Sequence, residues 1–277
     1  MPEGDTIFRS ARALHRALAG KIVTRFETAY AHLASVDDDQ KIFGRTVERV
    51  EARGKWLLIY FSGDLILVTH MRMNGSWHLY RAGERWRRPR RDMRIVIDNA
   101  DWSAVGFAVP VAEFHSAASL LRKTVIPALT QDLLKQDFDI AAAIDGMPEY
   151  ADEQIAEVLL NQRVMAGIGN VYKSEICFIC RVNPFRAVRT LDSSQLEQLV
   201  FTARKFLSLN VAEDASGEIS TYAGLRRTTY TSNPSARSWV YGRRGEPCRR
   251  CGTSIEMCKQ GLGARITFWC PVCQPMH

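Results

Sequence analysis

The stretch that decides the fold is Cys248-Arg249-Arg250-Cys251 together with Cys270-Pro271-Val272-Cys273, two Cys-x-x-Cys pairs separated by 18 residues. Two such pairs at this spacing are typical of a tetrahedral Zn²⁺ site with four thiolate ligands and no open position for substrate. We therefore expect one structural zinc ion on Cys248, Cys251, Cys270 and Cys273, and no organic cofactor. The ion would stabilise a hairpin too small to bury its own core, which we assign to residues 239–277.

The segment between the two cysteine pairs predicts what the hairpin presents. Gly261 and Gly263 precede an apolar strand that starts near Ile266, so the turn should expose Arg265. A guanidinium at a hairpin tip can contact phosphate, although a bare zinc ribbon could equally be a protein–protein module. Cys258, between the pairs, is expected to be a spare thiol.

Composition favours a nucleic-acid partner. The 277-residue chain has a formal net charge of +7 and a sequence pI near 9.1, which suits a polyanion. Arg85–Arg91 is densely basic and is either a phosphate contact or a flexible solvated loop. No apolar run is long enough to span a membrane, and the N-terminus lacks a secretory pattern. The metal-type spacing of four of the seven cysteines favours the reducing cytoplasm, or the nucleoid in a bacterium.

Residues 136–238 are expected to form a helical domain. Apolar residues recur at helical spacing in three segments, Glu153–Leu160, Asn170–Cys180 and Ser193–Leu209. Ser193 or Ser194 should cap the third helix. Cys177 and Cys180 lie in the second helix and are expected to be buried thiols rather than a redox pair. Gly217–Arg237, rich in small polar residues, is expected to be a long mobile loop.

A Gly-x-Gly turn precedes the second of these helices. Gly167 and Gly169 flank Ile168 directly before Asn170. Such a turn can direct backbone N–H groups and the positive end of a helix toward a phosphate, and Asn170 could add a side-chain contact. Helix–turn packing alone explains the same pattern, and the longer glycine pattern of a dinucleotide site is absent.

Residues 1–135 predict a β-sandwich preceded by a helix. The helix should have its N-cap at Asp5 or Thr6 and should stop at Gly20. Short β-like runs between glycine turns follow it, at Lys21–Thr28, Thr46–Ala52, Trp56–Phe61, Leu65–Thr69, Met93–Asp98 and Ser103–Val109. A helical segment, Ala117–Leu134, ends the domain. We therefore expect an α+β protein of three domains.

Two loops of this first domain carry candidate binding residues. Lys55 lies in a tight glycine turn before an apolar strand, where it could reach a phosphate or simply be solvated. Further on, a hairpin turn at Asn74-Gly75 should present His70, Arg72 and Met73 on a protruding loop. An exposed Met beside Arg suits a wedge inserted into a base stack, and the alternative is a packing residue.

The chain start, Met1-Pro2-Glu3, carries a candidate nucleophile. Removal of Met1 would leave Pro2 with a free secondary amine, and an α-amino group titrates near pH ~8. The uncharged amine can form an iminium with a sugar C1′, and Glu3 beside it can move protons. The alternative is that Met-Pro is only the start of translation.

The order of these motifs resembles the formamidopyrimidine-DNA glycosylase/endonuclease VIII family of base-excision repair enzymes over the whole chain. The resemblance is carried by Met1-Pro2-Glu3-Gly4, Arg53-Gly54-Lys55, His70-Met71-Arg72-Met73-Asn74-Gly75, Gly167-Ile168-Gly169-Asn170-Val171-Tyr172-Lys173-Ser174-Glu175, Tyr241-Gly242-Arg243 and Arg265-Ile266-Thr267-Phe268-Trp269-Cys270-Pro271-Val272-Cys273-Gln274. It implies an N-terminal β-sandwich, a helix-two-turn-helix domain and a zinc hairpin. The expected partner is double-stranded DNA with damaged bases or abasic sites, with no membrane, and the protein is expected to be a monomer.

The resemblance also implies catalytic roles. Pro2 would attack C1′ of a flipped-out nucleotide, and Glu3 would assist sugar-ring opening and proton transfer. Lys55 would bind a phosphate and act as proton donor in the first (β) elimination. Arg265 would bind phosphate and is linked to the second (δ) elimination. The result would be a glycosylase and a lyase in one chain.

DNA-binding roles follow in the same way. Asn170 would contact the backbone beside the flipped nucleotide, and His70 belongs to the same set of DNA-binding residues. Met73 would fill the gap left in the duplex, with Arg72 and Asn74 beside it.

The damaged base is predicted from two stretches. Gly4-Asp5-Thr6 looks like the endonuclease VIII branch, which favours oxidised pyrimidines. The 8-oxoguanine branch usually has a second void-filling loop with an Asp-Pro-Arg-Arg-Phe-Gly-like run, and Asn99–Phe107, taken as the corresponding stretch, lacks it. An 8-oxoguanine or formamidopyrimidine glycosylase and a non-catalytic damaged-DNA-binding protein are the alternatives.

Overall fold

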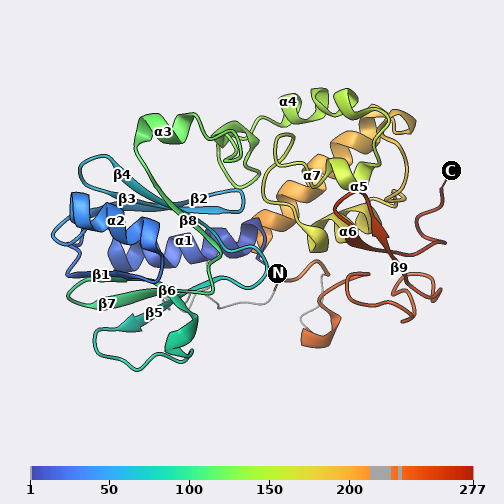
Figure 1. The fold of residues 1–277 in the computed structure, drawn as a ribbon. Helices are drawn as coiled ribbons and strands as arrows, with labels where there is room; N and C mark the ends of the chain where they lie inside the picture. Colours follow the sequence, from blue (N-terminus) through green and yellow to red (C-terminus); the bar gives the residue numbers. More distant parts are fainter. Residues whose placement is uncertain (1, 213–225, 230–232, 277) are drawn as a thin grey trace. The chain divides into compact units, whose positions relative to one another are not determined.

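The computed structural model describes residues 2–212, 226–229 and 233–276, which divide into two compact units (Figure 1). Unit 1 comprises the chain up to Ile126, and unit 2 comprises Pro127–Ala212 and the described residues from 226 onward. Both helices and strands are present, as the α+β prediction required. The finer division at residues 135 and 238 stays a prediction. None of the described helices combines the length and apolar character needed to cross a membrane.

Unit 1 is an antiparallel β-sandwich with a leading helix. Its elements are α1 (Gly4–Leu18), β1 (Arg25–Thr28), α2 (Ala31–Gln40), β2 (Val47–Arg53), β3 (Trp56–Phe61), β4 (Leu65–His70), β5 (Ser76–Arg81), a 3₁₀ turn (Arg90–Asp92), β6 (Met93–Asp98), β7 (Trp102–Phe107), β8 (Val111–His115) and α3 (Ala117–Leu121). One sheet has the strand order β1-β6-β7-β5 and the other β2-β3-β4-β8.

The core of unit 1 forms where α1 meets both sheets. The helix packs on β2 and β3 and also reaches β5 and β7 (Figure 1). Its predicted apolar face is buried as expected, namely Ile7, Ala11, Leu14 and Leu18. Alternation along β3 explains the layering, because Leu57 and Ile59 face this core while Leu58 and Tyr60 belong to a second cluster with Leu120 of α3. Both faces of the strand are therefore covered by apolar side chains.

The start of α1 differs from the prediction. The helix begins at Gly4, and its N-cap is Glu3 rather than Asp5 or Thr6. The Glu3 backbone carbonyl accepts from the N–H groups of Thr6 and Ile7, at 2.9 and 3.1 Å. Asp5 is instead fully buried and lies 3.7 Å from the Arg9 guanidinium. Pro2 therefore directly precedes the N-cap of the helix.

The loop after β4 also differs from the prediction. β4 pairs with β3 and β8, whereas β5 pairs with β7, so the two strands belong to different sheets. The predicted hairpin turn at Asn74-Gly75 is wrong, because the loop crosses from one sheet of the sandwich to the other. It is closed by a hydrogen bond from the Gly75 N–H to the Met71 carbonyl, at 2.8 Å. A Cβ on Gly75 would lie 2.7 Å from that oxygen, so the crossing requires glycine.

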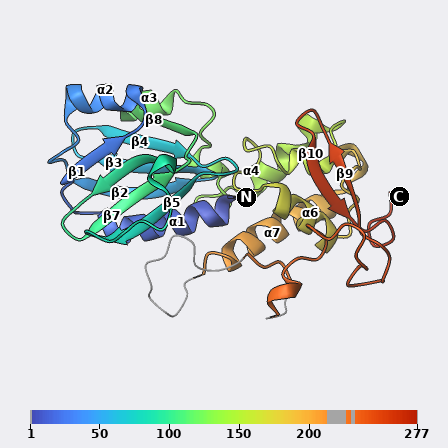
Figure 2. The same cartoon turned by 60° about the horizontal axis from the view of Figure 1, so that its bottom comes forward.

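Unit 2 combines short helices with a two-stranded hairpin. Its α-helices and strands are α4 (Ile140–Asp145), α5 (Ile155–Val158), α6 (Asn170–Ile179), α7 (Ser193–Leu209), β9 (Glu256–Gln260) and β10 (Arg265–Trp269). Short 3₁₀ turns occupy Leu129–Gln131, Met147–Tyr150, Val188–Thr190 and Pro234–Ala236. The helical core is built from the apolar faces of α5, α6 and α7, and Figure 2 shows β9 and β10 beside α6.

Several predicted boundaries in the helical part are wrong. Only Ala117–Leu121 of the predicted Ala117–Leu134 helix is α-helical, and a 3₁₀ turn at Leu129–Gln131 follows Pro127. The cap of α7 is Asp192, one residue before the predicted serines. Its carboxylate accepts from the Gln195 N–H at 2.8 Å, and the Gln195 side chain accepts in return from the Asp192 N–H. Most of the predicted Gly217–Arg237 loop, and Met1, lie outside the described residues.

Candidate active site and zinc centre

The four cysteines predicted to bind zinc lie together in unit 2. Their Sγ atoms are all within 4.8 Å of one another, with Cys248 to Cys273 at 3.8 Å and Cys251 to Cys270 at 3.4 Å. Thiolates placed tetrahedrally at ~2.3 Å from Zn²⁺ are roughly 3.8 Å apart, so the cluster fits the ion. The backbone N–H groups of Arg250 and Cys273 approach the sulfurs of Cys248 and Cys270 at 3.4 Å.

The remaining cysteines are thiols away from this centre. Cys177 is buried within α6 and Cys180 is buried at its C-cap, where the Cys180 sulfur lies 3.4 Å from the Thr202 hydroxyl. Burial raises the pKa of the Cys180 thiol to about 11, so it stays protonated at neutral pH. The prediction that Cys177 and Cys180 are buried thiols is confirmed. Cys258 is half-buried on β9.

The hairpin presents Arg265 as predicted. β9 and β10 pair with Arg265 opposite Gln260, and Gly261 adopts a φ of +67° at the turn. Arg265 and Leu262 are exposed. Further along β10, Phe268 packs with Phe178 of α6. The tip is therefore solvent-facing, while its base is attached to the helical core.

A buried carboxylate on α6 organises the chain that leads into the hairpin. Glu175 is fully buried and accepts hydrogen bonds from the backbone N–H groups of Trp239, Val240 and Tyr241, at 2.8 to 2.9 Å. It also accepts from the Thr228 hydroxyl. Three consecutive N–H groups on one carboxylate fix the approach to the zinc centre.

The Gly-x-Gly turn before α6 is built differently from the expected open phosphate cradle. Gly167 has a φ of +112°, and its N–H donates to the Gln162 side-chain oxygen at 3.0 Å, so it does not face outward. The Gln162 amide in turn donates to the carbonyls of Leu160 and Ile168. Asn170 is the first residue of α6 and is half-buried.

In unit 1, Pro2 and Glu3 lie at the N-terminus of α1. Pro2 is partly exposed, whereas Glu3 is fully buried. The positive end of the 15-residue helix disfavours a protonated amine on Pro2. A partly exposed amine beside a buried carboxylate can act as a nucleophile with a neighbouring proton-transfer group.

Lys55 and His70 lie at the same end of two paired strands. Lys55 and Gly54 form the two-residue turn between β2 and β3, with Gly54 at a φ of +56°. Trp56, the next residue, pairs with His70 of β4, and their rings meet edge to face at 4.8 Å. His70 Nδ1 accepts from the Arg72 N–H at 3.0 Å, so the neutral ring carries its proton on Nε2. Burial, reinforced by Lys55 and Arg72, lowers the pKa of His70 to about 4.

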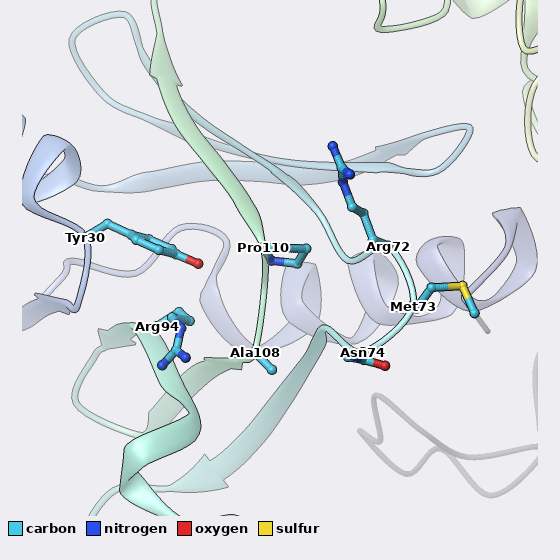
Figure 3. A pocket seen from close by; sticks show the side chains of 7 residues that line it. All are labelled: Tyr30, Arg72, Met73, Asn74, Arg94, Ala108 and Pro110. Atoms are coloured by element: carbon cyan, nitrogen blue, oxygen red, sulfur yellow. The ribbon is translucent and has the colours of Figure 1, made fainter. Parts of the chain in front are cut away.

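The sheet-crossing loop exposes Met73 beside a cavity. Met73 is 60% exposed, and Arg72 adopts a φ of +45°. In Figure 3 the side chains of Arg72, Met73 and Asn74 point in three different directions from the loop. With the turn at Ala108–Pro110 they line a cavity of about 540 Å³, whose other lining residues are Tyr30 and Arg94. An exposed Met at the tip fits the predicted wedge better than the packing alternative.

The segment next to Met73 is not the one compared in the sequence. Asn99–Phe107 forms the turn between β6 and β7 and the strand β7 itself, and the Asn99 amide donates to the Ala17 carbonyl. The turn at the cavity is Ala108–Pro110, with Ala108 at a φ of +47°. It contains neither Arg nor Phe.

The basic run Arg85–Arg91 is partly anchored to the sandwich. Arg88 donates to the Ser76 hydroxyl at 3.0 Å, and Arg90 lies 2.7 Å from Glu27. Trp86 contacts Phe107 edge to face. Neither of the two predicted readings, phosphate contact or free loop, describes these residues fully, because Arg87, Arg88 and Arg90 form ion pairs within unit 1.

The predicted site residues fall into both units. Unit 1 contains Pro2, Glu3, Lys55, His70, Arg72 and Met73, and unit 2 contains Asn170, Arg265 and the zinc cysteines. The sequence alone gave no role to Gln162 or Tyr30. Gln162 acts inside a turn, and Tyr30 lines a cavity with residues that are distant in the chain. Glu175 was quoted within a motif but was given no role. The only feature of the sequence that marks Glu175 is that it is a carboxylate within an apolar helix.

Comparison with known proteins agrees with this arrangement. Residues 1–108 match the Formamidopyrimidine-DNA glycosylase N-terminal domain, residues 129–221 the Formamidopyrimidine-DNA glycosylase H2TH domain, and residues 245–275 the Zinc finger found in FPG and IleRS. A crystal structure of Lactococcus lactis formamidopyrimidine-DNA glycosylase bound to abasic-site DNA has the same fold, with 23% identity, 99% coverage of both chains and a TM-score of 0.79.

Curated relatives are similar over nearly the full length. A probable endonuclease 8 2 of Streptomyces coelicolor is 40% identical over 99% of this chain and 94% of its own. The DNA-(apurinic or apyrimidinic site) lyase Nei2 of Mycolicibacterium smegmatis is 38% identical, with 99% of both chains covered. Endonuclease 8 of Escherichia coli is 30% identical over 99% of this chain and all of its own.

A β-sandwich, an H2TH helical domain and a four-cysteine hairpin define the class of zinc-finger DNA glycosylases. Within that class, this chain belongs to the formamidopyrimidine-DNA glycosylase/endonuclease VIII family. The family resemblance, the fold and the structural zinc predicted from the sequence are confirmed.

Replacing Cys270 with Ser should release zinc and disorder the hairpin, because the ion is held by four thiolates and the hairpin has only a small core. We expect the zinc content to fall from one ion per chain to near zero, and affinity for duplex DNA to fall at least about tenfold. Zinc is measured by atomic absorption and binding by fluorescence anisotropy. Cys258→Ser is the matched control and should retain the ion. Unchanged DNA binding after loss of zinc from Cys270→Ser would contradict a structural role.

The His70 imidazole should titrate near pH 4 in NMR spectra, with its proton on Nε2 above that pH. Because its folded-state pKa lies below the unfolded value, its contribution to stability is complete above about pH 6.5 and is lost as pH falls toward 4. Burial also lowers the pKa of His78 to about 4. His70→Asn should therefore remove only part of the acid destabilisation measured by chemical unfolding. A His70 midpoint near 6.5 would refute the assignment.

Proposed function

We propose that this protein is a bifunctional DNA glycosylase and abasic-site lyase that removes oxidised pyrimidines, with Pro2 as its nucleophile. One observation carries the proposal: Pro2 directly precedes Glu3, the fully buried N-cap of the helix α1. A binding protein needs no secondary amine at this position. Relatives of 38 and 40% identity named as Nei2 lyase and endonuclease 8 support the same activity. The enzyme would act on chromosomal DNA in the cytoplasm.

The proposed chemistry starts from the uncharged Pro2 amine of a chain without Met1. Its lone pair attacks C1′, and the C1′–N bond breaks, with the electron pair leaving on the base. Glu3 assists proton transfer to the ring oxygen as the sugar opens and the iminium forms. Loss of a C2′ proton then expels the 3′ phosphate by β-elimination, and δ-elimination expels the 5′ phosphate. The product is a one-nucleotide gap.

Unit 1 residues would bind DNA around the reacting sugar. Lys55, in its rigid two-residue turn, is proposed as a phosphate ligand and as the proton donor of β-elimination. Neutral His70 would donate through Nε2 to a phosphate, since its Nδ1 is occupied by the Arg72 N–H. Met73 would enter the gap left by the flipped nucleotide. Arg72 lines the adjacent cavity.

Unit 2 residues would bind the phosphates on either side of the flipped nucleotide. Asn170 combines a side-chain amide with the positive end of α6. Arg265 is exposed at the start of β10 and can make charge-assisted hydrogen bonds to phosphate. Its proposed role in δ-elimination follows from binding the phosphate that leaves.

The pyrimidine preference rests on the turn beside Met73. Ala108–Pro110 carries no Arg or Phe that could enter the stack as a second wedge. The Fpg structures with the same fold share only 22 to 24% identity with this chain, whereas relatives named endonuclease 8 reach 30 to 40%. An 8-oxoguanine preference remains the second candidate.

Borohydride trapping tests both the activity and the lesion. Duplexes with thymine glycol, dihydrouracil, 8-oxoguanine or an abasic site are incubated with the enzyme and reduced. We expect covalent complexes with the abasic site and both pyrimidine lesions, and at least about tenfold less with 8-oxoguanine. No complex with any duplex would refute the enzyme proposal and favour a damaged-DNA-binding protein. Stronger trapping at 8-oxoguanine would leave the chemistry intact but reverse the lesion assignment.

Changes at the chain start separate chemistry from binding. Pro2→Gly should slow base excision by at least about 10³-fold, because the secondary amine is lost. Glu3→Gln should slow it by roughly 10²–10⁴-fold through loss of proton transfer. Affinity for uncleaved duplex should stay within about threefold for both. A version that retains Met1 should be equally inactive. Full single-turnover activity in either variant would show that the assigned roles are wrong.

A further inference from the structure

Lys173 is a buried cation for which the reaction above has no use. It lies on α6, one helical turn after Asn170, and its side chain is fully buried. Among the described residues, its Nζ atom has no hydrogen-bond partner. Buried ammonium groups normally have a carboxylate or carbonyl partner, since burial removes the hydration of the charge. An unpaired amine at this depth calls for an explanation.

The groups facing Lys173 come from three elements. They are Glu157 of α5, Cys177 of α6 itself, and Cys258 and Arg265 of the hairpin. Burial lowers the pKa of Lys173 to about 8, against the opposing effects of Cys177 and Glu157, and Arg265 lowers it further. Burial also raises the pKa of both thiols, so they stay neutral near pH 8. Much of the Lys173 population is therefore an uncharged amine at that pH.

The Lys173 side chain is directed toward the N-terminal end of α6, where a phosphate is proposed to bind. Side chains on a helix lean toward its N-terminus, so Lys173 reaches back over the turn that begins at Asn170. The hairpin is attached at this turn, because the Phe268 N–H donates to the Ser174 hydroxyl at 3.3 Å, and that hydroxyl donates to the Asn170 carbonyl at 3.1 Å. Lys173 thus lies behind the site proposed for Asn170 and Arg265.

A phosphate at this site would change the charge balance around Lys173. Without DNA, Lys173 faces the like charge of Arg265 and the positive end of α6, both of which oppose its protonation. A bound phosphodiester places a negative charge against Arg265 and Asn170. This charge offsets both the Arg265 charge and the positive end of α6. Because the surroundings of Nζ are poorly screened, this effect reaches Lys173 without direct contact.

We propose that Lys173 is a positioning residue that takes up a proton from solvent when a DNA backbone phosphodiester binds at Asn170 and Arg265. The neutral amine becomes an ammonium, and no other bond changes. The buried charge then holds the phosphate electrostatically from behind Arg265. This inference rests on the proposed function, because it requires DNA at that site.

The test measures affinity against pH for a duplex that contains a tetrahydrofuran abasic analogue, which cannot be excised. Binding to the wild-type protein should weaken as pH rises from 6.5 to 9.5, with up to one extra proton bound in the complex. Lys173→Met should bind about tenfold more weakly at pH 6.5 and should converge with wild type at pH 9.5. Lys173→Arg should restore affinity and remain tight at high pH.

One further variant serves as a control. Lys259→Met removes an exposed lysine from the same hairpin and should keep the wild-type pH profile. The Pro2 amine titrates in the same range but is common to all four proteins. An unchanged pH profile in Lys173→Met would overturn the inference. So would equal losses in the Met and Arg variants at every pH, which would indicate packing alone. If wild type traps abasic DNA with borohydride but these results fail, only this inference is lost.

Discussion

The buried carboxylate of Glu175 accepts hydrogen bonds from three consecutive backbone N–H groups, Trp239 to Tyr241, and from the Thr228 hydroxyl. Leaving one buried donor unsatisfied costs roughly 1–3 kcal/mol, so this single side chain holds in place a segment that has no regular secondary structure. That segment leads directly into Cys248. The zinc centre fixes the hairpin internally, and Glu175 fixes it to α6.

Both units place residues that are proposed to react or to bind DNA at the ends of rigid elements. Pro2 precedes α1, Asn170 starts α6, Lys55 lies in a two-residue turn and Arg265 starts β10. Side chains at such positions lose little further entropy on binding. The charged groups of the protein act at particular places. Several basic-loop arginines pair with acidic groups, while the helix N-termini face positions proposed for phosphate or for an uncharged amine.

The sequence predicted the fold well where the residues of a single helix, strand or motif were enough to identify it. The apolar face of α1 and strands β3 and β6 were placed almost to the residue, and the cysteine spacing predicted the metal centre. The helix α2 was missed because only Leu33 of it is buried, so its apolar periodicity is weak. Strand pairing was mispredicted after β4, because a glycine turn does not reveal which sheet the next strand joins.

The residues of the candidate site also differ in how well the sequence predicted them. Pro2, Lys55 and Arg265 could be selected from motifs because the chemistry needs those residue types at turns and chain ends. Gln162 could not, since its role is to accept the Gly167 N–H that a sequence motif assigns to the ligand. Lys173 gave no signal either. A lysine in a helix is ordinarily solvated, whereas Lys173 is buried on α6, against which β10 packs.

The crossing of the Met71–Gly75 loop between the two sheets has a consequence for how the family can diversify. Each end of the loop is anchored in a different sheet, so its curvature depends on the spacing between them. That spacing is set by core residues such as Leu57 and Trp77. A change in the volume of such a core side chain is therefore expected to change the direction in which Met73 points. The residues proposed to contact DNA need not change for this to happen.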